Sequence, residues 1–174
     1  ISLIPLPLNF LTILFVILSI FLATGLINLV NFMDGLDGLV ASCMMVTFAT
    51  AIFILGLPAV FWVLPGSLFG FLLLNWSPAR VFMGDVGSTF LGAVFSGLLL
   101  HSKSIAIACS LLLVAFPILS DAAVCLIRRL LDGQAIFKPH RLHLYQRLYQ
   151  AGYSHRNVAL LYLSSTSLLS LSLL

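Results

Sequence analysis

The chain carries five acidic residues, all of them aspartates, and two of these stand three positions apart in one short polar stretch. This stretch, residues 28–39, reads NLVNFMDGLDGL and lies between long apolar runs. Its two carboxylates, each followed by a glycine that lets a ligand approach the main chain, suit a divalent metal, a ribose or a base edge. A turn between helices would also favour Asp and Gly. The added amides of Asn28 and Asn31, close to Asp34 and Asp37, favour a binding site over a simple turn.

A second polar stretch, residues 75–88, reads NWSPARVFMGDVGS and places Asp85 close to two glycines. We expect a helix to begin just after it, with Ser88 as the N-cap. The carboxylate of Asp85 would then be a ligand for Mg²⁺ beside a helix N-terminus whose free N–H groups suit a phosphate. A capping loop without further function is the simpler interpretation. The Asn, Arg and Asp of this one loop favour a site.

A third polar stretch, residues 138–147, is basic and reads KPHRLHLYQR. Proline is favoured at the first position of a helix, so Pro139 predicts a helix start. On that helix His140, His143 and Arg147 would fall on one face, and a basic face of this kind suits a diphosphate. The alternative is an amphipathic helix at the membrane interface whose basic side chains face lipid headgroups. Two histidines without a third ligand do not indicate a zinc site.

One further aspartate, Asp121, lies inside an apolar run, one helical turn after Pro117. An ionisable side chain within a membrane segment is a functional candidate by default. Arg128 follows two turns later on the same helix face. A structural ion pair between Asp121 and Arg128 is therefore as good an interpretation as a catalytic role.

The elements that must position these residues are long and apolar. Of the 174 residues, 61% are hydrophobic and 7% are charged, and the mean hydropathy is +1.20, whereas a soluble domain has roughly a quarter charged residues. A spanning helix needs about 20 apolar residues, and unbroken runs do not alternate as barrel strands do. We therefore expect an all-α fold, a polytopic transmembrane helix bundle that forms one integral membrane domain over residues 1–174. Its expected spans, about six, cover residues 8–29, 39–57, 59–74, 89–100, 105–127 and 158–174.

The order of spans and polar stretches predicts how the chain crosses the membrane. Two spans separate the first polar stretch from the second, and two more separate the second from the third, so all three would lie on one side. Of the eight Lys and Arg residues, all except Lys103 fall on that side. By the positive-inside rule this side is cytoplasmic, which accounts for the net charge of +3 without a nucleic-acid partner.

Three motifs together are similar to those of the polyprenyl-phosphate N-acetylhexosamine-1-phosphate transferase family, of the glycosyltransferase family 4 type. They are N-x-x-N-x-x-D-G-x-D-G-L at residues 28–39, F-M-G-D-x-G-S at residues 82–88 and a histidine-containing stretch that follows. The third, H-R-x-H-x-Y-Q at residues 140–146, resembles the O-antigen-initiating branch more than the phospho-MurNAc-pentapeptide transferase branch. The order of the motifs and their common side of the membrane also match this family.

The resemblance implies a reaction and its partners. Undecaprenyl phosphate would attack the sugar-side phosphorus of a UDP-N-acetylhexosamine at the cytoplasmic face of the bacterial inner membrane. The products would be polyprenyl-diphosphate sugar and UMP, and Mg²⁺, or Mn²⁺ in its place, would be required. The enzyme would be a multi-pass protein of the lipid bilayer that initiates O-antigen or other cell-surface polysaccharide synthesis, with a homo-oligomer as a further expectation.

The resemblance also implies roles for individual residues. Asp85 would hold the metal. The catalytic set would be Asp34, Asp37, Asp85, His140 and His143. The substrate-binding set would be Asn28, Asn31, Lys138, Arg141 and Arg147.

In one respect the chain departs from the family pattern. The family also has a pair of adjacent aspartates in its N-terminal half, and this chain has no adjacent acids and begins with Ile1. We therefore expect it to be the C-terminal part of a longer transferase. The alternatives are a catalytically incomplete fragment that binds substrate and, less favoured because the polar stretches share one side, a membrane transporter. The sequence does not identify which N-acetylated sugar is used.

Overall fold

The computed structural model describes residues 9–134 and 142–174, and the regular structure in these ranges is helical. In chain order the elements, of which η1 is a short 3₁₀ helix, are α1 (Phe10–Phe32), α2 (Leu39–Leu55), η1 (Ala59–Trp62), α3 (Val63–Asn75), α4 (Gly84–Leu100), α5 (Ile105–Val114), α6 (Phe116–Leu131), α7 (Leu144–Gln150) and α8 (His155–Leu171). No strand forms within the described ranges, which confirms the predicted all-α fold.

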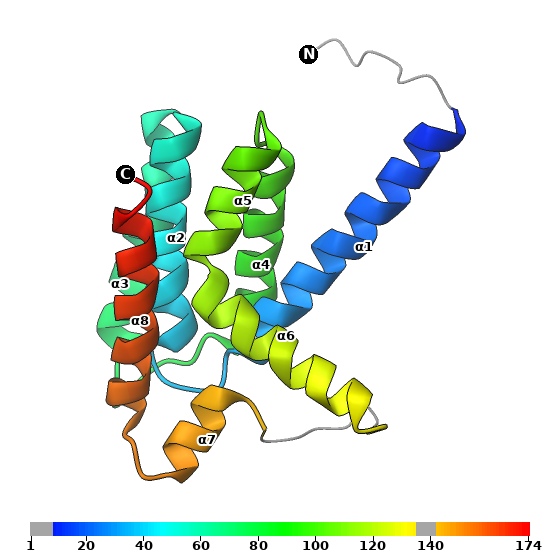
Figure 1. Cartoon of the computed structure of the whole chain (residues 1–174). Helices are drawn as coiled ribbons and strands as arrows, with labels where there is room; N and C mark the ends of the chain where they lie inside the picture. Colours follow the sequence, from blue (N-terminus) through cyan, green and yellow to red (C-terminus); the bar gives the residue numbers. More distant parts are fainter. Residues whose placement is uncertain (1–8, 135–141) are drawn as a thin grey trace.

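The centre of the bundle is α2, which contacts α3, α4, α5 and α8 (Figure 1). Its side chains Met44 and Phe48 are fully buried, and they join a core to which α4, α5 and α6 contribute Phe95, Leu111 and Ile118. The first helix, α1, leans away from this group at its N-terminal half and packs against α4 and α6 near its C-terminal end. The core therefore ties together helices that are far apart in the sequence.

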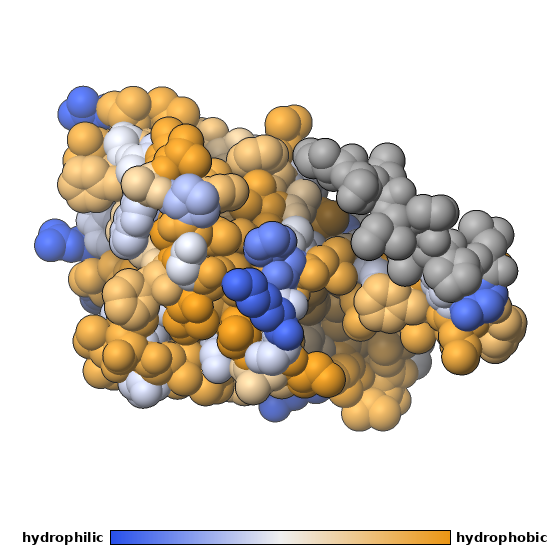
Figure 2. All heavy atoms as spheres, turned by 90° about the horizontal axis from the view of Figure 1, so that it is seen from above, coloured by the Kyte–Doolittle hydropathy of each residue, from blue (hydrophilic) through white to orange (hydrophobic). Residues whose placement is uncertain are grey.

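The outer surface is largely apolar. Large hydrophobic side chains such as Phe15, Phe21, Phe69 and Ile105 are more than half exposed, and hydrophobic residues dominate the face seen in Figure 2. A soluble monomer rarely exposes such large apolar areas. A surface of this kind is instead what lipid-facing helices require.

The lengths and hydropathies of the helices agree with a membrane bundle. Among the described residues α1 is long and apolar enough to cross a membrane alone, with 23 residues and a mean hydropathy of 2.7. The bent pair formed by α5 and α6 passes the same test as a unit. Three shorter apolar segments accompany them, Leu39–Leu55, Ala59–Asn75 and Gly84–Leu100.

The expected fifth span, residues 105–127, is not one straight helix. It divides at Ala115 into α5 and α6, which are bent by 83° relative to each other. Pro117 in the first turn of α6 explains the break, because proline lacks the N–H for the helix ladder and its ring clashes with the carbonyl four residues earlier. The bend directs α6 along one end of the bundle, where it meets α1, α7 and α8.

The polar stretches gather at one end of the bundle, the lower end in Figure 1, as far as they lie in the described residues. There α1 and α3 end and α2, α4 and α8 begin, and α7 lies below them in Figure 1, in contact with α6 and α8. We call this the site end. The turns that join α2 to η1 and α4 to α5 lie at the opposite end, as the count of spans predicts.

Close contact between α1 and α4 fixes the first two polar stretches relative to each other. A Cβ atom on Gly92 would lie 2.7 Å from the Cα of Ile27, so the two backbones approach this closely because Gly92 has no side chain. One turn closer to the site end, the same two helices carry Asn31 and Ser88. The contact therefore sets the distance across which these side chains meet.

Candidate functional site

The last turn of α1 and the first turns of α4 meet through Asn31. Its amide Nδ2 donates to Oγ of Ser88 at 2.8 Å and to Oδ1 of Asp85 at 3.3 Å. The prediction that Ser88 is an N-cap is wrong, because α4 begins earlier, at Gly84, and Ser88 is a buried residue of its second turn. Asp85 instead lies in the first turn of α4, where a helix N-terminus favours negative charge.

Asp34 lies in the turn between α1 and α2 and is partly buried. Burial, and to a smaller extent the negative charge of Asp85, raises the pKa of Asp34 to about 6. A partly buried carboxylate with a second carboxylate nearby is a position where a bound cation would be favourable. The described residues contain no group of three or more His, Cys, Asp or Glu that would hold a metal ion by themselves.

Asp37 has different partners from Asp34. Its Oδ2 accepts a hydrogen bond from the backbone N–H of Ala79 at 3.2 Å and lies 3.2 Å from Nδ1 of His155 at the start of α8. Asp37 thus connects the turn before α2 to the loop before α4 and to the last helix. Nothing local in the sequence predicts the pairing of His155 with Asp37, because the two residues are distant in the sequence.

The loop between α3 and α4 is held by a buried amide. Asn75 accepts a hydrogen bond at Oδ1 from the backbone N–H of Gly38, at 3.1 Å, and donates from Nδ2 to the carbonyl of Val81, at 2.8 Å. Gly38 has φ +73°, a conformation that L side chains rarely adopt, and it packs against the ring of Trp76. The glycine that suggested close approach of a ligand is therefore approached by a tryptophan from the next loop.

His143 is buried and stands immediately before α7. Within its described part the predicted helix from Pro139 through Arg147 begins later than expected, because residues 142 and 143 are not helical, whereas residues 144–147 are helical in α7, which begins at Leu144. The His143 ring is stacked on the ring of Tyr145, with centroids 5.6 Å apart, and lies 6.4 Å from the ring of Phe32. This places it beside the end of α1 that leads to Asp34.

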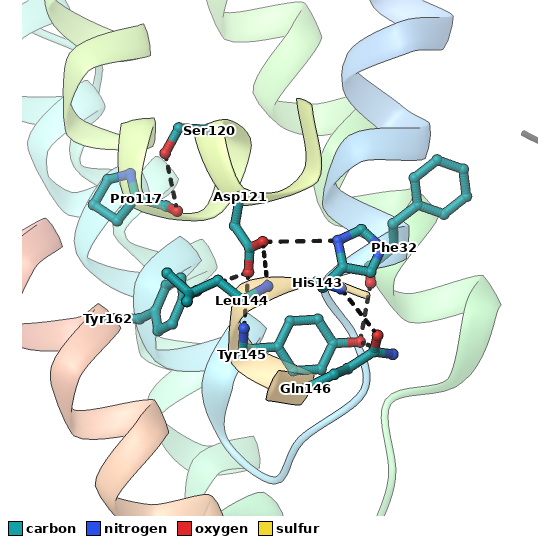
Figure 3. Close-up of polar contacts among 9 residues, drawn as sticks. All are labelled: Phe32, Pro117, Ser120, Asp121, His143, Leu144, Tyr145, Gln146 and Tyr162. Carbon is teal, nitrogen blue, oxygen red and sulfur yellow. Dashed lines mark hydrogen bonds and ion pairs between the residues drawn. The ribbon is translucent and has the colours of Figure 1, made fainter. Parts of the chain in front are cut away.

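The segment that carries His143 is fastened by Asp121 (Figure 3). Oδ1 of Asp121 accepts from the N–H of Leu144 at 2.7 Å, and Oδ2 accepts from the N–H of Tyr145 at 3.1 Å and from the hydroxyl of Tyr162 at 2.7 Å. The predicted ion pair with Arg128 is wrong: no such pair forms among the described residues, and the carboxylate serves α7 and α8 instead.

The remaining predicted residues lie apart from this cluster or outside the described residues. Asn28 is exposed on α1 and donates to the carbonyl of Thr24 within the same helix. Arg147 is exposed on α7. Lys138, His140 and Arg141 lie outside the described residues.

A groove of about 950 Å³ runs between α6, α7 and α8. Its walls are largely apolar and include Phe116, Leu161 and Leu168, and they also include Arg128 and Arg147 from the last turns of α6 and α7. Arg128 was expected to orient the chain or to pair with Asp121, and nothing local in the sequence predicts that α6 and α7 bring Arg128 and Arg147 to one groove. Such a groove suits a ligand with a long apolar part and an anionic head.

Comparison with known proteins gives consistent matches. The profile of the family described as "Glycosyl transferase family 4" matches residues 1–103. The decaprenyl-phosphate N-acetylglucosaminephosphotransferase of Mycobacterium leprae is 34% identical over 84% of this chain and 44% of its own length. The probable undecaprenyl-phosphate N-acetylglucosaminyl 1-phosphate transferase of Bacillus subtilis is 35% identical over the same shares. The phospho-N-acetylmuramoyl-pentapeptide-transferase of Carboxydothermus hydrogenoformans is 34% identical over 83% of this chain and 46% of its own length.

The chain therefore spans about half the length of the curated relatives it matches. Their names share a sugar-phosphate transfer and differ in the sugar. Since relatives of both kinds are 34% identical to it, the resemblance to the O-antigen-initiating branch stays a prediction.

Proposed function

Because the chain belongs to glycosyl transferase family 4, we propose that it transfers an N-acetylhexosamine 1-phosphate from a UDP-sugar to undecaprenyl phosphate. The products are polyprenyl-diphosphate sugar and UMP, and the lipid-linked sugar starts an O-antigen or other cell-surface polysaccharide. Relatives named for decaprenyl-phosphate and undecaprenyl-phosphate substrates support the acceptor class. The donor is left at the class of N-acetylhexosamines, because discrimination among them depends on a few contacts.

The observation that carries this proposal is the pair of carboxylates at the site end. Asp34 and Asp85 are close enough for the charge of Asp85 to raise the pKa of Asp34, and Asn31 binds Asp85 directly. Magnesium in phosphoryl-transfer sites is held by one or two carboxylates together with substrate phosphates. Two carboxylates without a third acidic or histidine ligand fit that pattern, and Mn²⁺ takes the same kind of ligand. When bound, such an ion supplies neutralisation of the charge on the donor diphosphate.

The groove between α6, α7 and α8 supports the lipid acceptor. Its apolar wall offers surface for a prenyl chain, and Arg128 and Arg147 offer cations for the lipid phosphate. Guanidinium groups bind phosphate oxygens through paired hydrogen bonds. The segment around His143 lines the groove through Leu142 and Leu144, and the His143 ring lies beside Phe32 at the end of α1 that leads to Asp34, so a lipid phosphate and a nucleotide diphosphate would approach each other there.

The reaction needs little covalent help from the protein. An oxygen of the lipid phosphate forms a bond to the sugar-side phosphorus, the bond from that phosphorus to the oxygen of UMP breaks, and UMP leaves with that oxygen. Phosphoryl transfer of this kind depends mainly on positioning and on neutralising charge. The arginines would orient the acceptor, Asn31, Asp34 and Asp85 the donor, and His143 the diphosphate between them.

We further propose that the site end faces the cytoplasm of a bacterium and that the chain lies in the inner membrane. The supporting observation is the bias of the basic residues, of which Arg80, Arg128, Arg147 and Arg156 are described residues of loops or helix ends at the site end. Nucleotide sugars are cytosolic and undecaprenyl phosphate is a membrane lipid. The two substrates can therefore meet only at the cytoplasmic surface.

The test is a transfer assay on the chain in lipid nanodiscs that contain undecaprenyl phosphate. We expect UMP release from UDP-N-acetylglucosamine with Mg²⁺ and none with EDTA. Asp85→Asn should lower turnover about a hundredfold or more, the scale seen when a group that stabilises developing charge is removed. Full turnover by Asp85→Asn would refute the assignment of Asp85 to the metal.

A catalytically incomplete, substrate-binding chain is the second candidate. It is favoured by the small number of acidic ligands in the described residues. Calorimetric titration with UDP-N-acetylglucosamine distinguishes the two. Binding without UMP release supports the second candidate, and turnover excludes it.

A further inference from the structure

Asp121 is a buried carboxylate to which the proposed reaction gives no direct role. Its side chain accepts three hydrogen bonds, and two of the donors are the backbone N–H groups of Leu144 and Tyr145 at the start of α7. The first N–H groups of a helix have no partner within that helix. Asp121 therefore caps α7 from another helix, at a separation of 23 residues.

The segment capped in this way is fixed on its other side to the carboxylate cluster. The hydroxyl of Tyr145 donates to the carbonyl of Phe32, the last residue of α1, at 3.2 Å. A Cβ atom on Gly35 would overlap that hydroxyl, so the ring of Tyr145 fills the space against the turn that carries Asp34. From Asp121 to this turn the contacts are continuous and leave little room for α7 to shift.

His143 lies within this connection. It directly precedes α7, its ring is stacked on Tyr145, and its side chain is 5% exposed. Nδ1 of His143 lies 3.9 Å from Oδ1 of Asp121, which is beyond hydrogen-bond distance but within the range of an ion pair (Figure 3). Two of the three shorter contacts of Asp121 go to the main chain that follows His143, so the carboxylate acts on the histidine also through the position of the backbone.

We propose that Asp121 is a positioning residue, which holds α7 so that the His143 ring stays beside the end of α1 and the Asp34 turn. The inference rests on the proposed function only for its effect on turnover. The anchoring of α7 is a structural claim that stands or falls by itself. A buried carboxylate that holds a backbone segment by two N–H groups also explains why an acid lies on the buried face of α6.

The anchoring is tested by hydrogen–deuterium exchange of the chain in nanodiscs. In Asp121→Asn the amides of Leu144 and Tyr145 lose a charged acceptor, and their exchange should become about ten- to a hundredfold faster, the range for a hydrogen bond to a charged group. The peptides of α2 should exchange as in the wild type. Asp132→Asn, which removes a carboxylate from the exposed end of the same helix, is the matched control and should leave α7 unchanged.

The effect on the reaction is tested with the same variants in the UMP-release assay. Asp121→Asn should lower kcat about tenfold or more with KM for the UDP-sugar nearly unchanged, because a misplaced group costs most in the transition state. Asp121→Glu can still accept both N–H groups and should recover part of the loss. A variant that had only lost stability would not separate kcat from KM or respond to glutamate in this way.

The outcomes separate the two claims. Unchanged exchange of Leu144 and Tyr145 in Asp121→Asn, or faster exchange throughout the chain, would overturn the anchoring of α7. Faster exchange confined to α7 with normal kcat would overturn the positioning role and leave the proposed reaction intact. Absence of UMP release in the wild type would count against the proposed function, while the exchange measurement would still decide the anchoring.

Discussion

Replacing Asp34 with asparagine should make the folded chain more stable at neutral pH while removing the proposed activity. The carboxyl group is partly buried beside Asp85, and burial, followed by that neighbouring charge, raises its pKa from 3.8 to about 6. The folded state therefore disfavours the ionised form that is present at neutral pH. Asparagine keeps the shape of the side chain and removes the charge.

The size of the effect follows from the pKa difference. Each tenfold change in proton affinity corresponds to about 1.4 kcal/mol, so the upper limit of the gain in the free energy of unfolding is about 3 kcal/mol. Solvent screens a partly exposed carboxylate, which reduces the expected gain to about 1 kcal/mol. For a chain of this length that gain raises Tm by roughly 2–4 °C.

The gain should depend on pH in a defined direction. Between pH 3.8 and about 6 the folded chain binds more protons at Asp34 than the unfolded chain, so wild-type stability falls as the pH rises through this window. Below the window both states are protonated and the cost is absent. The Tm of Asp34→Asn should therefore exceed that of the wild type at neutral pH and approach it near pH 4 (roughly the ordinary carboxyl pKa).

The measurement is thermal unfolding in nanodiscs with EDTA, followed by tryptophan fluorescence, since Trp76 packs at the site end against Gly38. Asp85→Asn should give a smaller gain, because the charge of Asp85 is the lesser of the two causes. Asp132→Asn, on the exposed end of α6, should give none. The reasoning is refuted if Asp34→Asn lowers Tm at neutral pH, or if its gain does not diminish near pH 4.

Three further predictions concern the metal and the scaffold. Millimolar Mg²⁺ should raise the Tm of the wild type in EDTA-free buffer and leave the Tm of Asp34→Asn nearly unchanged. An equal rise in both would show that the ion binds away from Asp34. Gly92→Val should force α1 from α4 at Ile27 and lower turnover about tenfold or more through displacement of Asn31, whereas Gly97→Val, with open space at that position, should not. Asn75→Ala should lower the free energy of unfolding by roughly 2–4 kcal/mol, because it leaves the N–H of Gly38 and the carbonyl of Val81 without their partner; an unchanged midpoint in a denaturant titration would contradict this.

Much of this architecture could be predicted from the sequence, because a helix that faces lipid leaves an unbroken apolar run. The run that becomes α2 was predicted within two residues of its observed bounds, Leu39–Leu55. The prediction was wrong where local chemistry is ambiguous. Ser88 follows two glycines and its position is typical of an N-cap, but the helix begins at Gly84. The bend before Pro117 could not be predicted, because it depends on the space into which α6 turns.

The site could be predicted in part for a related reason. Asn31, Asp34 and Asp85 were identified because polar residues are rare in this chain, and the structure brings the three together. The hydrogen-bonding role of Asp121 could not be predicted, since its partners Leu144 and Tyr162 lie 23 and 41 residues away. A sequence pattern shows helix periodicity, but it does not show hydrogen bonds between residues that far apart.

The residues that could be predicted and those that could not share one physical cause. Within a bilayer a polar group cannot obtain hydrogen bonds from water, so it must be satisfied by the protein or remain where a ligand or the interface can reach it. The side chains of Asn75 and Asp121 form hydrogen bonds with backbone groups of neighbouring segments and so fix those segments. The hydroxyls of Thr50 and Ser170 form a hydrogen bond of 2.6 Å between α2 and α8. Asp34 has a raised pKa and no such capping contact among the described side chains. Among the described residues, the hydrogen-bond partners of Asn75 and Asp121 thus mark them as scaffold residues, and the proposed function leaves Asp34 for a ligand.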